Sequence, residues 1–185
     1  MAWIILGAVV AVVLYLVMVY NRMVALRQGT GQAWSDVDVQ LKQRHDLVPN
    51  LVETVKGYAA HERGTLDEVI RARNAAASAS GPAAAAAAEG ALSGALGRLF
   101  ALSEAYPDLK ANQNFLSLQG ELADIENKIA AARRFFNNAV GEYNTAIQSV
   151  PAVFFAGSLG FRASAFFELP EPDRAAVQQA PAVKF

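Results

Sequence analysis

The side chains best suited to acid–base or metal chemistry lie in two short polar runs. The first run contains Arg44, His45, Asp46 and Asn50, and the second contains His61 and Glu62. A shared metal ion would require the two imidazoles to converge. His45 and His61 are sixteen positions apart, so on one helix they would be separated by about 24 Å, and only ligation between two chains could join them. The sequence has no cysteine, no HExxH motif and no Glu-x-x-His motif. We therefore expect no metal and no cofactor.

Catalysis by these residues is not expected either. A Ser or Thr nucleophile needs a base that a third group orients. His45 and Asp46, like His61 and Glu62, are adjacent in sequence and would point about 100° apart on a helix. The sequence also lacks a nucleophile elbow and a glycine-rich phosphate loop. It therefore predicts no catalytic residues and identifies no small-molecule substrate.

Pro49 suggests a structural role for the first polar run. Proline removes one backbone donor and crowds the carbonyl of His45, so we expect a bend there. The polar side chains around it would satisfy the freed carbonyls, or would pair across helices with acids such as Glu121, Asp124 and Glu126. The alternative is a recognition surface, which we consider the less favoured interpretation.

The elements that would position these residues begin with a membrane-spanning helix. Residues 2–21 carry no charged side chain and reach roughly 30 Å as a helix, which is about the thickness of the hydrocarbon core. Trp3 and Tyr20 suit the two interfaces. Arg22 and Arg27 follow the span, which predicts an N-terminus outside and a cytoplasmic domain. A cleaved signal peptide is the competing interpretation, but no Lys or Arg precedes Trp3 and no small-residue cleavage site follows.

Beyond the span, apolar residues continue at three- and four-residue steps, which predicts one helix from Ala2 to Asn74, about 110 Å long. Span and first bundle helix would then form one rod bent at Pro49, unless Gly29 and Gly31 make a flexible joint. The Ala-rich tract at 75–90 predicts a turn at Gly81-Pro82, followed by a helix over 83–104.

The most regular period begins at Phe115 and stops at Pro151, which predicts a helix of about 35 to 40 residues. An intramolecular bundle explains the pattern best, with a coiled coil to a second molecule as the alternative. Residues 151–169 are rich in Phe and predict a cap on the bundle end, with a partner groove or membrane contact as the alternative. Residues 170–185 predict a flexible tail.

The predicted fold class is therefore all-α: an N-terminal transmembrane helix, residues 1–21, and an antiparallel long-helix bundle over residues 22–150. The formal net charge of −1 and a pI near 6.1 argue against a nucleic-acid partner. The expected partners are the lipid bilayer through residues 2–21 and other proteins or further copies of the chain.

Four blocks of the sequence resemble the LemA family of bacterial membrane proteins. They are YNRMVALR (20–27), AWSDVDVQLKQRHDLVPNLVETVKGYAAHERGTLDEVIRAR (33–73), YPDLKANQNFLSLQGELADIENKIAAARRFFNNAVGEYNTAI (106–147) and FFAGSLGF (154–161). The resemblance implies an N-terminal anchor followed by long antiparallel helices, and no established reaction. It also implies a place in the bacterial envelope or in an organelle membrane such as that of magnetosomes.

Three function classes follow from these observations. The favoured one is a membrane-anchored helical scaffold or adaptor that works through protein contacts or self-assembly. The second is a membrane-shaping or lipid-binding protein, against which the near-neutral charge argues. The third is an unrecognised enzyme that uses the His45 or His61 region.

The role assigned to Pro49 predicts the effect of replacing it. Pro49→Ala restores the missing backbone donor, so it should straighten the helix and mildly stabilise the fold. Urea unfolding followed by circular dichroism measures this effect. A clear loss of stability would count against a purely structural Pro49.

Overall fold

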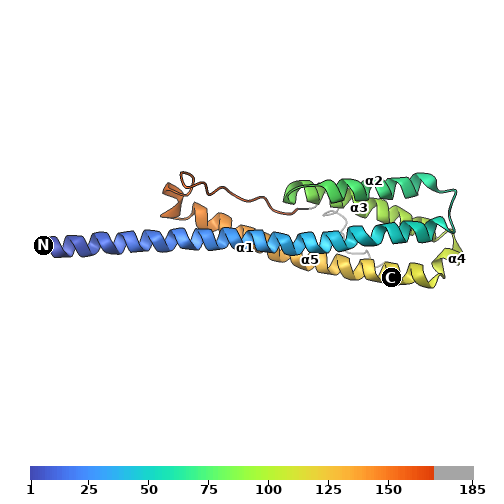
Figure 1. Cartoon of the computed structure of the whole chain (residues 1–185), viewed down its shortest axis with the longest axis horizontal. Helices are drawn as coiled ribbons and strands as arrows, with labels where there is room; N and C mark the ends of the chain where they lie inside the picture. The colour runs from blue at the N-terminus through green and yellow to red at the C-terminus, as the bar shows by residue number, and fades with distance from the viewer. Residues whose placement is uncertain (169–185) are drawn as a thin grey trace, which may run out of the picture. The chain divides into compact units, whose positions relative to one another are not determined.

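Long helices dominate the computed structural model, which describes residues 1–168 (Figure 1). The helices are α1 (Ala2–Lys56), α2 (Arg63–Ser78), α3 (Pro82–Ser103), α4 (Pro107–Lys110) and α5 (Gln113–Gln148), and a 3-10 turn follows at Ala152–Phe154. Every regular element in this part of the chain is a helix, which confirms the predicted all-α class. The tail expected at 170–185 lies outside the described residues.

The expected single helix from Ala2 to Asn74 was wrong at its far end. α1 stops at Lys56, and six residues that include Gly57 and Ala59 reverse the chain before α2 starts. The apolar stripe nevertheless continues, since Val55, Ala59 and Leu66 are all buried. Periodicity did not reveal the reversal because both helices turn their stripes toward one core. α1 does run through Gly29, Gly31 and Pro49 without interruption.

Local signals place the other helix boundaries close to their predicted positions. Gly81 has a φ of +82°, a conformation that suits glycine, and Pro82 occupies the first turn of α3. Asn112 caps α5, because its side-chain oxygen accepts a hydrogen bond from the backbone N–H of Phe115 at 3.0 Å.

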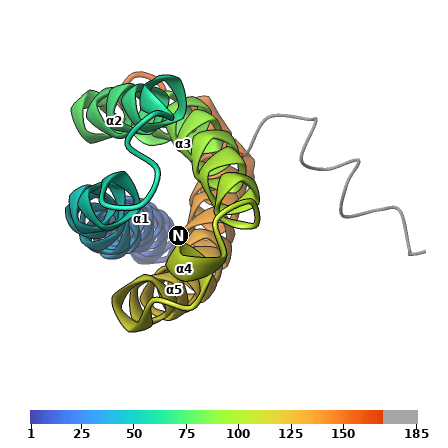
Figure 2. The ribbon, with the colours of Figure 1, turned by 90° about the vertical axis from the view of Figure 1, so that its right-hand side faces the viewer.

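The described chain divides into two compact units. The bundle unit comprises residues 38–131 with Phe167 and Glu168, and the anchor unit comprises residues 1–37 and 132–166. In the bundle unit, parts of α1 and α5 join α2, α3 and α4 around one core (Figure 2). Its fully buried members include Leu51, Val69, Leu92, Leu99 and Leu109.

In the anchor unit, the C-terminal part of α5 lies beside α1 (Figure 1). Met23 of α1 packs with Tyr143 and Ile147 of α5 and with Ala156 and Phe161 of the segment that follows. Asn144 holds this returning segment: its Oδ1 accepts from the Ser164 backbone N–H at 2.8 Å, and its Nδ2 donates to the Ser164 carbonyl at 3.0 Å.

The first part of α1 is exposed along its length. Met1–Met18 are all exposed, and a window within α1 is long and apolar enough to cross a membrane. Exposed apolar side chains over such a length are stable only in a hydrocarbon environment.

The core assignment predicts a difference between two leucines. Leu51 is fully buried and Leu116 is 48% exposed, so Leu51→Ala should lower the free energy of unfolding by about 2–5 kcal/mol. Leu116→Ala should cost less than about 1 kcal/mol. Urea unfolding of the full chain in detergent compares the two variants, and equal effects would refute this core.

Candidate functional site

Arg44 is a buried cation at the centre of the bundle unit. It is 3% exposed, and its guanidinium reaches two other helices. Nη1 donates to Glu89 Oε2 of α3 at 2.8 Å. Nη2 donates to Ser93 Oγ of α3 at 2.9 Å and pairs with Glu126 Oε1 of α5 at 2.8 Å. Arg44 thereby joins α1 to α3 and α5. Of the three acids expected to pair across helices, Glu126 is the one that pairs with Arg44.

His45 shares the same carboxylate. Its Nε2 lies 2.5 Å from Glu89 Oε1, and both residues are buried. Nε2 is the donor of this bond when the carboxylate is ionised, because an ionised carboxylate only accepts hydrogen bonds. Glu89 therefore receives one bond on each oxygen, from Arg44 and from His45. We call Arg44, His45, Glu89, Ser93 and Glu126 the buried charge cluster.

The carbonyl that Pro49 leaves without its helical partner is also satisfied. Arg73 of α2 donates from Nε to the backbone oxygen of His45 at 3.1 Å. Asp46, Pro49 and Asn50 are exposed. Together with this bond, the hydrogen bonds and ion pairs of Arg44 and His45 connect α1 to α2, α3 and α5.

The second polar run lies apart from this cluster, in and beside the turn between α1 and α2. His61 is exposed. Glu62 accepts a hydrogen bond from the Tyr106 hydroxyl at 3.2 Å. Loss of surrounding water and the Glu62 carboxylate both raise the pKa of Tyr106 above its ordinary value, so its hydroxyl stays protonated at neutral pH.

The buried charge cluster is suited to holding helices together. Ser93 accepts from the Arg44 guanidinium, and the His45 imidazole bonds to the Glu89 carboxylate, so these hydrogen bonds pair no hydroxyl nucleophile with a base. In residues 1–168, no group of three or more His, Cys, Asp or Glu side chains has the geometry to hold a metal ion. The Arg44 charge beside the His45–Glu89 pair would also repel a cation.

Sequence reasoning missed Glu89, Ser93 and Arg73. Glu89 is the one acid in the Ala-rich tract at 75–90, and it was assigned no partner from the sequence. A single charged side chain in an otherwise apolar helix needs a polar partner once that helix is packed against others. This isolated charge was the sequence signal that could have identified Glu89 as a buried, paired residue.

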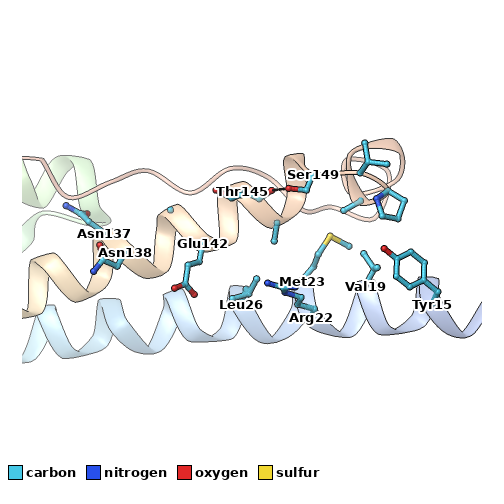
Figure 3. Close-up of a pocket in the computed structure, with 15 residues that line it drawn as sticks. Tyr15, Val19, Arg22, Met23, Leu26, Asn137, Asn138, Glu142, Thr145 and Ser149 are labelled. Carbon is cyan, nitrogen blue, oxygen red and sulfur yellow. Dashed lines mark hydrogen bonds between the residues drawn. The ribbon is translucent and has the colours of Figure 1, made fainter.

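A second feature is a groove in the anchor unit of about 810 Å³ (Figure 3). The α1 side is lined by Tyr15, Val19, Arg22, Met23 and Leu26, and the α5 side is mostly polar, with Asn137, Asn138, Glu142, Thr145 and Ser149. Steps of three and four residues place each set along one helix face. We call this the juxtamembrane groove, because it extends from within the apolar run to beyond Arg22.

The residues predicted to mark the membrane boundary have distinct surroundings. Trp3 is exposed, and Arg22 lines the groove. Tyr20 meets the Phe161 ring edge-on at 5.7 Å between centroids, and the Arg27 guanidinium lies 4.9 Å from the centre of the same ring. Phe161 is thus held between an aromatic ring and a cation of α1.

Removal of the Glu89 carboxylate should make the bundle unit less stable. Glu89→Ala leaves two buried donors without their acceptor, so we expect the free energy of unfolding to fall by about 3–5 kcal/mol. Glu104→Ala is the matched control, because it removes the exposed ion pair to Lys110 and should cost at most about 1 kcal/mol. Denaturant unfolding of the full chain tests both, and a Glu89→Ala loss no larger than the control's would contradict the assigned role.

Comparison with known proteins gives the chain its family. It is similar to the magnetosome protein MamQ of Magnetospirillum gryphiswaldense, with 28% identity over 90% of this chain and 71% of that protein. It is also similar to the magnetosome proteins MamQ 1 and MamQ 2 of Paramagnetospirillum magneticum, each 27% identical over 87% of this chain and 69% of the relative. The LemA family model matches residues 33–185. The chain belongs to the LemA family.

Proposed function

We propose that this protein is a membrane-anchored helical scaffold that acts without catalysis, by binding other proteins or further copies of itself in the bacterial envelope. Membership of the LemA family and the apolar start of α1 support a place at a membrane. The MamQ relatives are named magnetosome proteins, which is consistent with an organelle membrane as one such place. Arg22 and Arg27 favour a cytoplasmic location for the residues that follow the span.

The observation that carries this proposal is the juxtamembrane groove. The long helices of the anchor unit are α1 and α5 alone, and two helices side by side leave one face of their contact uncovered. A further helix can cover this face by packing its own apolar side chains between α1 and α5. The groove therefore favours assembly as the activity of this protein.

The groove also indicates what kind of helix it accepts. Tyr15 and Val19 lie inside the apolar run and Leu26 lies beyond it, so an occupant must pass from the membrane into water alongside α1. The Asn, Thr and Ser side chains of α5 can hydrogen-bond across a helix interface. Glu142 is exposed and faces the groove (Figure 3), where it can attract a basic residue.

The α1 helix of a second copy meets these requirements. It leaves the membrane at the same level and carries Arg22 and Arg27, which complement Glu142. Two copies that exchange α1 contacts would form an isologous pair. We therefore propose a second copy as the occupant of the groove.

Site-specific photocrosslinking in native membranes tests the proposal. A photoreactive amino acid at Asn138, which is exposed and lines the groove, should yield an adduct of twice the mass of the chain. The control is Gln28, an exposed α1 residue that does not line the groove and lies on the far side of the helix.

The mass of each adduct decides the outcome. An adduct with another protein at Asn138 would replace self-assembly with an adaptor role. Equal yields at both positions, or no protein adduct at Asn138, would overturn the groove as a contact surface.

A further inference from the structure

The turn that follows α5 exposes large apolar side chains. Phe154 is 80% exposed, Val150 75%, Leu159 50% and Val153 48%. The same turn also contributes Ala152, Ala156 and Phe161 to the anchor-unit core. Its conformation is therefore held by packing, while four of its apolar side chains are largely exposed. We call Val150, Val153, Phe154 and Leu159 the apolar tip.

The apolar tip lies at the level where α1 leaves the membrane. Val150, Pro151 and Ala152 line the same groove as Tyr15 and Val19 of α1. Arg22 is the first charged residue after the apolar run. Measured along α1, Val19 lies about 4.5 Å and Tyr15 about 10 Å on the membrane side of Arg22. The turn thus overlaps the last turns of the apolar run. In Figure 3, Ser149, which directly precedes the turn, lies at the level of Arg22 and Met23.

The charges around the turn have the pattern of a membrane interface. Residues 149–167 contain no acidic side chain and one basic one, Arg162. Insertion of the tip would therefore bury no carboxylate. Arg22, Arg27 and Arg162 are exposed next to it, where they can meet lipid phosphates. Tyr20, packed on Phe161, adds an aromatic ring of the kind enriched at this depth.

We propose that the apolar tip inserts into the bilayer interface, in the leaflet from which α1 emerges, and forms a second membrane contact of this protein. The lipid bilayer is the occupant because the tip is continuous with the surface of the span itself. A single helix can rotate about its own axis in the membrane, whereas a helix with an inserted turn beside it cannot do so freely. The contact therefore orients the α1/α5 pair, and it does not depend on the groove binding a partner.

Labelling at single cysteines tests this contact, because the natural chain has none. We would label Phe154→Cys and Leu159→Cys with an environment-sensitive fluorophore and reconstitute the full chain into phosphatidylcholine–phosphatidylglycerol vesicles. The matched control is Phe135→Cys, an exposed phenylalanine of α5 that is 61% exposed. Its neighbour Phe136 meets Trp34, about 18 Å beyond Arg22 along α1, so the control lies outside the bilayer.

Quenchers at known depths separate the outcomes. We expect lipids with a nitroxide near the headgroup to quench the labels at 154 and 159 several-fold more than the label at 135, and aqueous iodide to show the reverse order. Equal lipid quenching at all three positions would overturn the proposal. A second result would also overturn it: the label at 154 is not quenched by lipid and is shielded from iodide only at a high protein-to-lipid ratio. In that case a second copy of the chain, and not the bilayer, would cover the tip. Circular dichroism of each labelled chain confirms that the helices are retained.

Discussion

A run of twenty uncharged residues at the start of α1 is stable only in hydrocarbon, and this constraint determines the surroundings of the anchor unit. It places Arg22 at the boundary between lipid and water. The end of α5 and the turn after it pack beside this part of α1, although they lie more than 120 residues further along the chain, and the proposed contact of the turn with the bilayer follows from this packing.

The bundle unit depends on a different balance. Its core consists mainly of apolar side chains, yet Arg44 and Glu89 are buried as well. A buried ion pair adds little net stability compared with an apolar pair of the same size, but removal of one partner is costly. The buried charge cluster therefore contributes mainly to specificity: it favours the arrangement in which α1, α3 and α5 meet at Arg44. Arg73 adds α2 through the carbonyl that Pro49 frees.

The bundle unit and the anchor unit together indicate how this chain acts. Residues whose side chains could do acid–base chemistry, such as His45, are used to hold helices together. The juxtamembrane groove and the apolar tip are both exposed and both lie beside α1. Contact with other molecules, either protein or lipid, is the activity that such surfaces can support.

The sequence alone determined the helical class, the apolar run at the N-terminus, and the approximate helix boundaries at Pro82, Phe115 and Pro151, because these depend on local propensity and on the periodicity of neighbouring residues. Tertiary structure decided what depends on elements far apart in the chain. Glu89 became the partner of Arg44 only when α3 packed on α1, and the reversal after Lys56 was hidden because both helices face one core. The Phe-rich segment shows the same limit: Phe161 is buried and Phe154 is exposed, although the two side chains are chemically identical. Composition does not distinguish them, since only packing against α1 determines which ring is covered.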